Sequence, residues 1–294
     1  MPDGPRPGGP GGPDRPDRSD RLRPAAHGFA GAGAADAYEQ ARPSYPAEAV
    51  AHVVGHGGLG PGRRVLDLAA GTGKLTRLLV PSGAEVAAVE PVAEMRAHLA
   101  SIDPPIEVLD GTAEAIPLPD ASVDVVTVAQ AFHWFDPPAA LAEIRRVLVP
   151  GGWLFLLWNT RDRGHDWVRQ FGDLLVDGDD GVAERPYDSY YDVDYGEVVA
   201  TAAPGAFGPV ARWEHRWEQP TDEELLVARA ASVSVVGLLA PADRDTVLDR
   251  VRNLARTHPD LAGRSWFGFP YVTRVWRWQA TTDEATDGTG SSSA

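Results

Sequence analysis

The residues best suited to chemistry lie in one stretch, where an acidic side chain is followed by two closely spaced glycines. Asp67 stands in the apolar run 64–68, and Gly71 and Gly73 follow it, before leucines recur at helical spacing. Glycine lets the backbone approach a ligand closely, and a helix N-terminus offers free N–H groups. The stretch therefore predicts a strand, turn and helix that bind a nucleotide, with a turn that binds no ligand as the alternative.

Three ligands compete for such a turn. A P-loop requires glycine at position 68 and Ser or Thr directly after its lysine, whereas this sequence has Leu68, and Leu75 follows Lys74. A dinucleotide fold prefers a third glycine at position 76, where the sequence has Thr76. The third ligand is S-adenosylmethionine, because the stretch resembles the first motif of the class I methyltransferases.

A second acidic residue, Glu90, ends the next apolar run, at 84–89, and lies nineteen residues after Gly71. A carboxylate at the tip of the second strand can accept hydrogen bonds from both ribose hydroxyls. Pro91 is then predicted at the first position of a helix that carries Met95 on one face. The alternative for Glu90 is a surface carboxylate favoured by the helix dipole, and both roles are compatible.

The elements that must position these residues alternate between apolar strands and helices. Gly71, Glu90, Thr112 and Gln130 each follow a predicted strand. Strand–helix repeats with short links give a parallel sheet with helices on both faces, whose ligands bind at the carboxyl ends of the strands. The predicted strands cover residues 64–68, 84–89, 106–109, 123–129 and 153–158.

Composition narrows the classes of protein and of site. The 294 residues, 43% of them hydrophobic, allow one large α/β domain or two small ones. The absence of cysteine excludes disulfides, thiolate catalysis and Cys-ligated zinc, and we predict no metal site. A net charge of -15 disfavours nucleic acid, and no apolar run reaches membrane-spanning length. We expect a soluble cytoplasmic protein and leave its oligomeric state open.

Both terminal segments are poor in apolar side chains. Residues 1–26 are dominated by Pro, Gly, Asp and Arg, and residues 281–294 by Thr, Gly and Ser. Such segments cannot bury enough surface to offset the entropy lost on ordering. We therefore predict two disordered tails on either side of one domain at 27–280.

The start of that domain, residues 27–54, carries Tyr38, Arg42 and Tyr45 close together and next to prolines. Taken alone, this segment is a polar turn before a short helix at 47–54, because proline after Arg42 disfavours helical geometry there. Beside a nucleotide-binding fold it becomes a lid over the site. Arg42 is then a candidate partner for the carboxylate of the cofactor.

Two ring side chains, His133 and Trp134, follow the fourth predicted strand just after Gln130. Histidine can take a proton near neutral pH, so His133 is the candidate general base for a hydroxyl or amine acceptor. Trp134 and Tyr45 are candidate walls, because a sulfonium favours the π face of an aromatic ring. Ordinary packing in the scaffold is the alternative role for these side chains.

Taken together, these motifs resemble the class I S-adenosylmethionine-dependent methyltransferases, in the type-11 domain group that includes trans-aconitate methyltransferase. The resemblance covers about residues 29–162, and its most specific marker is Leu-x-Pro-Gly-Gly at 148–152. The segment 38–46 is similar to the N-terminal lid of that family. Ala69 departs from the pattern, because the family often has its first glycine there, and Thr112 stands where many relatives have aspartate.

The resemblance implies a doubly wound α/β fold, with a mostly parallel seven-stranded sheet, helices on both faces and an antiparallel C-terminal strand. It places a cofactor-binding core at 63–160 and a helical substrate cover with edge strands at 162–280. Two predicted strands, 210–218 and 271–279, fit the edge of that sheet.

The resemblance also implies a set of cofactor contacts. Without aspartate at Thr112, adenine recognition is expected to rely more on the backbone at Ala113 and Glu114. The residues expected to bind the cofactor are Asp67, Ala69, Ala70, Gly71, Gly73, Glu90, Pro91, Met95, Thr112, Ala113, Glu114 and Gln130.

We therefore expect a methyltransferase that uses S-adenosylmethionine and acts on a small-molecule acceptor. The cofactor brings an activated methyl group, so the protein must bind it, exclude water and align the acceptor. The alternatives are a nicotinamide-dependent oxidoreductase, disfavoured by Thr76, and a non-catalytic nucleotide-fold binding protein, which the fold alone does not exclude. The sequence leaves open the identity of the acceptor and whether O, N or C is methylated.

Overall fold

A seven-stranded sheet with the order β3-β2-β1-β4-β5-β7-β6 organises the computed structural model, which describes residues 39, 42–175 and 193–282. Strands β1 to β5 are parallel, and β7 runs antiparallel to both of its neighbours. The predicted fold class is confirmed. The strands are β1 (Arg64–Leu68), β2 (Glu85–Val89), β3 (Glu107–Leu109), β4 (Val123–Ala129), β5 (Leu148–Arg161), β6 (Ala211–Thr221) and β7 (Phe267–Gln279).

Helices cover both faces of this sheet, because successive side chains of a buried strand point to opposite sides. Leu66 and Leu68 pack with α6 and α8 on one face, whereas Val65 packs with α3 and α4 on the other. The helical elements are α3 (Ala47–Gly57), α4 (Thr76–Leu79), η1 (Val80–Ser82), α5 (Ala93–Leu99), η2 (Phe132–Trp134), α6 (Pro137–Val147), α7 (Asp166–Leu174), α8 (Tyr195–Ala202), α9 (Glu223–Ala231), α10 (Ser234–Gly237) and α11 (Pro241–Thr257).

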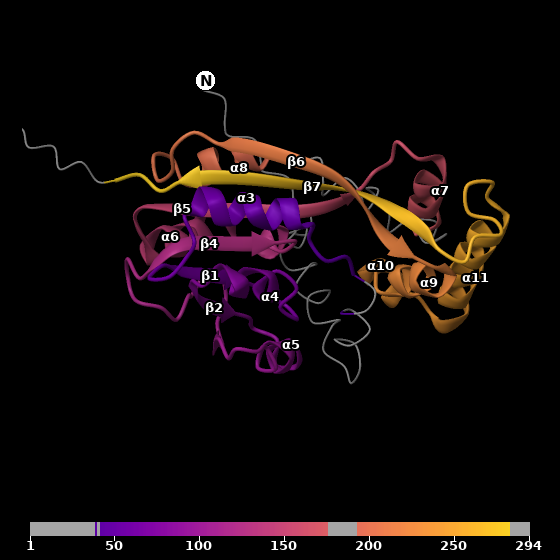
Figure 1. Cartoon of the computed structure of the whole chain (residues 1–294), viewed down its shortest axis with the longest axis horizontal. Coiled ribbons are helices and arrows are strands. Elements are labelled where there is room, and N and C mark those ends of the chain that lie inside the picture. The colour runs from indigo at the N-terminus through magenta and orange to yellow at the C-terminus, as the bar shows by residue number, and fades with distance from the viewer. Residues whose placement is uncertain (1–38, 40–41, 176–192, 283–294) are drawn as a thin grey trace, which may run out of the picture.

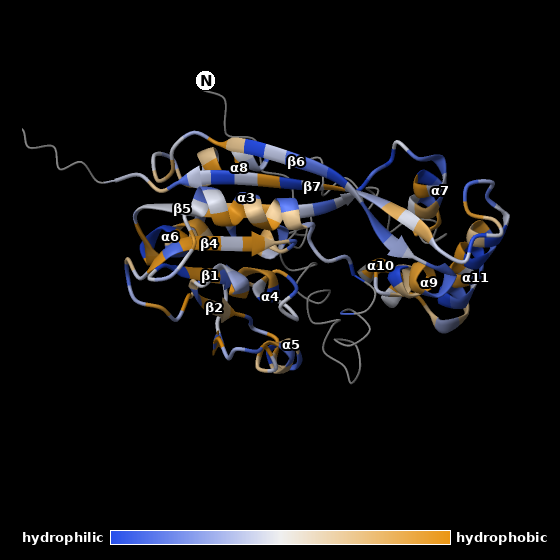
Figure 2. Ribbon diagram, in the orientation of Figure 1, coloured by the Kyte–Doolittle hydropathy of each residue, from blue (hydrophilic) through white to orange (hydrophobic). Residues whose placement is uncertain are grey.

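The long strands β5, β6 and β7 connect the sheet to a second lobe. We call it the cover lobe and define it as α7, α9, α10, α11 and the first part of β7. Figure 1 shows β6 and β7 sweeping from the sheet to these helices. In the core of the cover lobe, Trp167 and Phe171 of α7 are buried against Phe269 and Tyr271 of β7. Apolar residues of α9 and α11 complete this core. In Figure 2 the central strand β4 is mostly apolar, whereas the outer strand β6 is largely polar.

Several predicted boundaries differ from the structure. Helix α3 and strands β6 and β7 extend three or four residues beyond the predicted 47–54, 210–218 and 271–279. Helix α5 begins at Ala93, so Pro91 is exposed and lies two residues before the helix rather than at its first position. The N–H of Val92 donates to the Glu90 carboxylate, which holds the chain extended at Val92, where φ is -87° and ψ is 114°. Strand β5 is also longer than predicted, because it pairs with β7 as far as Arg161.

The predicted N-terminal tail and Tyr38 lie outside the described residues, as do residues 283–294. Thr281 is part of the described fold and donates its backbone N–H to the carbonyl of Ala206. Within the described ranges, no helix is both long and apolar enough to cross a bilayer.

Candidate active site

The glycine turn after β1 is built from left-handed backbone. Ala69, Gly71 and Gly73 have φ values of 55°, 58° and 88°. A Cβ on Gly73 would lie 2.7 Å from Cδ2 of Leu99, so a glycine there lets α5 pack closely against the turn. A left-handed conformation costs a residue with a side chain about 1–2 kcal/mol, and such strain gathers at functional sites. Ala69 therefore marks the carboxyl end of β1 as a candidate ligand site.

Asp67 lies beneath this turn rather than on its surface. Its side chain is 1% exposed, and its two carboxylate oxygens accept hydrogen bonds from Thr76 Oγ1 at 2.6 Å and Thr127 Oγ1 at 2.9 Å. Burial raises the pKa of Asp67 to about 6, although both hydroxyl bonds oppose that shift. The structure thus gives Asp67 a supporting role, because it ties α4 and β4 to the base of the turn.

Glu90 joins the turn to the end of β2. Its carboxylate accepts the backbone N–H of Gly71 at 2.9 Å through one oxygen and that of Val92 at 2.9 Å through the other. The residue is 5% exposed, and burial raises its pKa while the two N–H bonds oppose the rise. Met95 is buried and lies next to Gly71. Glu90, Met95 and the glycines are therefore brought together as predicted.

Arg96 contributes to the same corner and was not identified from the sequence. Its guanidinium donates to the carbonyl of Glu90 at 2.8 Å and to the carboxylate of Asp110 at 2.9 and 3.0 Å. These bonds fix the carboxyl ends of β2 and β3 relative to each other. An arginine six residues after an acidic strand end carries no distinctive sequence signal.

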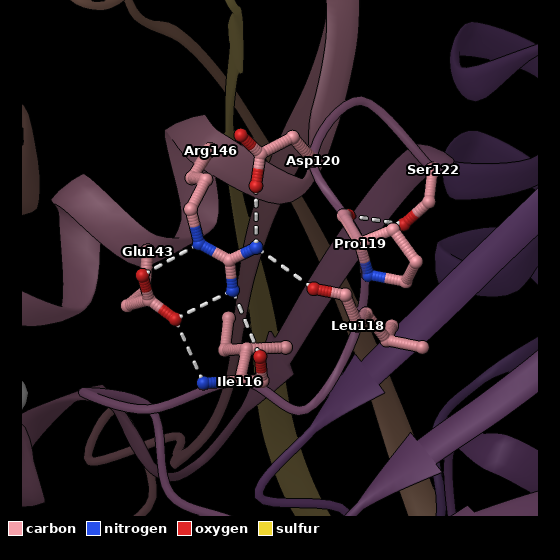
Figure 3. A network of polar contacts seen from close by, with 7 residues as sticks. All are labelled: Ile116, Leu118, Pro119, Asp120, Ser122, Glu143 and Arg146. Carbon is pink, nitrogen blue, oxygen red and sulfur yellow. Dashed lines mark hydrogen bonds and ion pairs between the residues drawn. The ribbon is translucent and has the colours of Figure 1, made fainter.

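The loop after β3 is held against α6 by a polar network centred on Arg146. Its guanidinium donates to Glu143, to Asp120 and to the carbonyls of Ile116 and Leu118, as Figure 3 shows. Glu143 also accepts the backbone N–H of Ile116 at 2.9 Å. These hydrogen bonds raise the pKa of Arg146 and lower that of Glu143. The loop is therefore held against α6 at several points, with Arg146 and Glu143 half-buried and Asp120 exposed.

The predicted adenine segment begins this loop. Thr112 and Glu114 are exposed, whereas Ala113 is buried in the core beneath α6. The Glu114 carboxylate accepts the backbone N–H of Asp136 at 3.0 Å, which joins this loop to the start of α6. The three residues thus lie at the carboxyl end of β3, and Glu114 already has a structural contact.

Gln130 ends β4 with a left-handed φ of 60°, the same unusual geometry that Ala69 shows at the end of β1. Its side-chain amide donates to the carbonyl of Asn159 on β5 at 3.1 Å. Asn159 in turn donates to the carbonyl of Ser44 at 2.8 Å and accepts from Thr273 at 2.6 Å. Asn159 was not predicted as a site residue, yet it links β4, β5, β7 and the N-terminal segment.

His133 and Trp134 belong to the short turn η2, just beyond Gln130. Their ring centroids lie 4.4 Å apart, and the His133 ring lies 6.4 Å from that of Trp158. Trp134 is half-buried and packs against the core, while Trp158 is buried and stacks on Tyr195. Aromatic rings therefore gather at the carboxyl end of β4.

The N-terminal segment crosses the glycine turn. Glu39 accepts a hydrogen bond from Thr72 Oγ1, its backbone carbonyl accepts from Lys74 Nζ at 2.5 Å, and its carboxylate lies 3.5 Å from Arg77 Nη1. Burial lowers the pKa of Lys74, and the negative charge of Glu39 opposes that change. Glu39 was not singled out from the sequence, because a glutamate beside Tyr38 carries no spacing signal.

The same segment reaches the cover lobe. Arg42 donates to the carbonyl of Ser232, at the end of α9, at 2.7 Å. Tyr45 is 8% exposed and packs with Ala49 and Val53 of α3 in the core. Arg42 thus lies at the boundary between the two lobes. Tyr45 packs in the core, and its role as a wall of the site stays a prediction.

Comparison with known proteins gives consistent matches. The family profile described as a methyltransferase domain matches residues 66–156. A Mycobacterium tuberculosis protein named as an uncharacterized methyltransferase is 44% identical over 241 residues, which is 82% of this chain and 91% of the relative. Another uncharacterized methyltransferase, from Schizosaccharomyces pombe, is 42% identical over 139 residues, covering 47% of this chain and 55% of that protein.

Solved structures extend the likeness to the fold. A structure from Anabaena variabilis, provisionally named as a methyltransferase, has a TM-score of 0.55 at 22% identity and covers 80% of this chain and 98% of its own. One from Anaeromyxobacter dehalogenans, also provisionally named as a methyltransferase, has a TM-score of 0.51 at 24% identity and covers 82% and 97%. At these identities the likeness concerns the fold alone.

Proposed function

This chain belongs to the methyltransferase domain family, and on that premise we propose that it transfers the methyl group of S-adenosylmethionine to a small-molecule acceptor. The observation that carries the proposal is the corner where the turn through Gly71 and Gly73 meets Glu90. There a strained backbone, two glycines and a buried carboxylate converge at the carboxyl ends of β1 and β2.

The residues at this corner fit the cofactor. A carboxylate has about four acceptor positions, and each oxygen of Glu90 uses one of them for a backbone N–H. Glu90 can therefore accept two ribose hydroxyls while it still holds the turn. Met95, which is buried next to Gly71, adds an apolar surface, and the backbone at Ala113 and Glu114 would meet the adenine.

The remaining roles follow from position. When bound, S-adenosylmethionine supplies a methyl group activated on a sulfonium, so the chain need not provide a nucleophile. The N-terminal segment, fixed through Glu39 and Ser44, would exclude water from the carboxyl ends of the strands. The half-buried Trp134 would line the acceptor side, where its π face suits a cationic group. We further propose that Asp67 acts by holding the turn rather than by touching the cofactor.

Calorimetry with the full-length chain tests cofactor identity. S-Adenosylmethionine and S-adenosylhomocysteine should bind in the micromolar range, which corresponds to about -8 kcal/mol. Glu90→Ala should weaken both by about 1.5–3 kcal/mol, because the charge-assisted bonds to ribose are lost. Saturable binding of NADH with no response to S-adenosylhomocysteine would refute the proposal. Tight cofactor binding without release of S-adenosylhomocysteine across an acceptor panel would favour a non-catalytic binding protein.

We propose His133 as the general base if the acceptor is a hydroxyl or an amine. It lies in η2, directly after the end of β4, where the acceptor should approach the methyl group. His133→Gln should slow methyl transfer by about 10²–10⁴ and leave cofactor affinity unchanged. The neutral-pH limb of the rate profile should also disappear. Near-normal turnover in this variant would show that His133 is not the base and only packs in the scaffold.

A further inference from the structure

An asparagine in a largely apolar strand is the starting point. Asn159 of β5 is 4% exposed and follows the buried apolar residues Leu156, Leu157 and Trp158. Burying an amide costs free energy unless its donors and acceptors find partners, so an apolar side chain would pack at this position at a lower cost. Asn159 instead forms hydrogen bonds with three other segments of the chain, and these bonds indicate its role.

The orientation of the Asn159 amide is fixed by a chain of donors that starts at the edge of the sheet. Trp217 Nε1, which can only donate, bonds to Thr273 Oγ1 at 2.8 Å. The hydroxyl of Thr273 therefore uses its own hydrogen for Asn159 Oδ1, at 2.6 Å. Because its oxygen is directed at Thr273, Asn159 presents its Nδ2 donor to the opposite side.

On that opposite side, Asn159 Nδ2 donates to the backbone carbonyl of Ser44 at 2.8 Å. Ser44 is exposed and belongs to residues 42–46, which form neither helix nor strand and lead directly into α3. Asn159 therefore anchors an irregular stretch of chain just before that helix begins.

This anchor lies at the proposed active site. The backbone carbonyl of Asn159 accepts the side-chain amide of Gln130 at 3.1 Å, and Gln130 follows β4 in a left-handed conformation. Two residues before Ser44, Arg42 donates to the carbonyl of Ser232 in the cover lobe. Figure 1 shows the indigo chain that precedes α3 running from the carboxyl ends of the strands toward α10. Asn159 thus bonds both to the end of β4 and to a segment that reaches the cover lobe.

We propose that Asn159 is a positioning residue for methyl transfer, whose amide holds residues 42–46 against the carboxyl ends of β4 and β5. Asparagine accepts on one side and donates on the other, so it satisfies both Thr273 and Ser44. Aspartate has the same shape but, when ionised, no hydrogen for Ser44, and leucine has a similar volume but neither polar group. This inference rests on the proposed function, because the site beside this segment is the proposed site of methyl transfer.

Hydrogen exchange in the ligand-free, full-length protein tests the anchor. The reporters are the backbone N–H groups of Ala49 and Val50, which donate to the carbonyl of Pro46 in the first turn of α3. Asn159→Asp should accelerate their exchange at least about fivefold, because the donor to Ser44 is lost. Asn159→Leu, which buries no charge, should do the same and gives the result if Asn159→Asp does not fold.

Two threonine variants separate positioning from a general loss of stability. Thr273→Val removes the donor to Asn159 Oδ1 but leaves the bond to Ser44, and Thr160→Val removes a bond to the carbonyl of Val272 between the same two strands. Both threonines are buried, so both variants should lower the free energy of unfolding measured with urea. Exchange in the first turn of α3 should stay within about twofold of its natural rate. Acceleration equal to that of the Asn159 variants would overturn the proposal, and so would a natural exchange rate in both Asn159 variants.

The rate at which S-adenosylhomocysteine dissociates, measured by surface plasmon resonance, links the anchor to the site. Release should be about tenfold faster from both Asn159 variants, because residues 42–46 no longer keep their position, and within about twofold of the natural rate from Thr160→Val. An unchanged rate in both Asn159 variants would overturn the role in the site. If the unmodified protein does not bind S-adenosylhomocysteine, the proposed function fails, while the exchange measurement still decides whether Asn159 positions the segment.

Discussion

Asp67, in the half of the molecule that we propose binds the cofactor (β1 to β5 and their helices), and Arg229, in the cover lobe, are both buried ionisable groups, but they are stabilised differently. Two threonine hydroxyls, from α4 and β4, donate to Asp67, whereas aromatic rings of β7 and an amide of β6 surround Arg229. Burial moves both groups toward neutrality, raising the pKa of the acid and lowering that of the guanidinium. The same physical penalty is met by two short hydroxyl side chains at Asp67 and by larger aromatic rings and an amide at Arg229.

This difference indicates a division of labour. The cofactor-binding half fixes its polar groups through backbone N–H groups and short side chains, and Glu90 and Gly71 illustrate this. Such a site is rigid and suited to one ligand. The cover lobe instead uses long side chains from separate elements, as Arg229 and Gln219 illustrate.

Removing the N-terminal segment, which contacts both the glycine turn and the cover lobe, should have the largest effect on activity. Deletion of residues 1–46 removes the contacts of Glu39 with the turn and of Arg42 with Ser232, and it should abolish methyl transfer. Deletion of residues 1–26 should leave activity intact. Steady-state release of S-adenosylhomocysteine measures both. Equal activity in the two truncated proteins would contradict the lid interpretation and the link between the halves.

Gly73→Ala should destabilise the cofactor-binding half by about 3–4 kcal/mol. Its Cβ would meet Leu99 at 2.7 Å, and φ is 88°, so overpacking and backbone strain add. Gly71→Ala is the matched comparison, because its Cβ would meet only Met95 Sδ, at 3.6 Å, and it should cost about 1 kcal/mol of backbone strain. Urea unfolding measures both, and equal losses would show that the close approach to α5 is unimportant.

Asp67→Asn should alter the pH dependence of stability. With a folded pKa of about 6 against an ordinary 3.8, the native state keeps a proton that the unfolded chain has lost between about pH 4 and 6. The stabilisation from Asp67 is therefore complete below pH 4 and is lost as pH rises through 6. The asparagine side chain does not titrate, so the variant keeps the same stability where the natural protein loses it. The unfolding free energy of the variant minus that of the natural protein should therefore increase by about 3 kcal/mol from pH 4 to pH 7. A constant difference across that range would exclude the raised pKa.

Ala69→Gly should give the smallest effect, a gain of about 0.5–1 kcal/mol in unfolding free energy. Relief of the left-handed strain at φ 55° exceeds the added flexibility of the unfolded chain. Ala70→Gly, at a neighbouring position without positive φ, should instead lower stability by about 0.5–1 kcal/mol. Thermal unfolding of the two variants measures both changes in stability. A loss of stability in both variants would argue against backbone strain at Ala69.

Local pattern alone determined the succession of strands along the chain and the place of the glycine turn. Strand β4 has the predicted bounds, 123–129, because a β-branched apolar run flanked by polar residues favours one conformation over its whole length. Gly71, Glu90, Thr112 and Gln130 lie at carboxyl ends of strands as expected, since parallel topology follows from strand–helix repeats. The fold class therefore followed from the sequence, and so did the strand ends at which the candidate site lies, whereas the roles of its residues stay predictions.

Only the tertiary structure decided what each polar side chain contacts. The sequence gives no sign that Asp67 turns beneath the loop, that Glu90 takes the N–H of Val92 and so delays α5 beyond Pro91, or that Arg42 reaches Ser232. Arg229 meets Phe269, which lies forty positions further along the chain. These contacts depend on how whole elements pack, because a long or buried polar group is satisfied by whichever partner the fold brings near, at any separation in sequence.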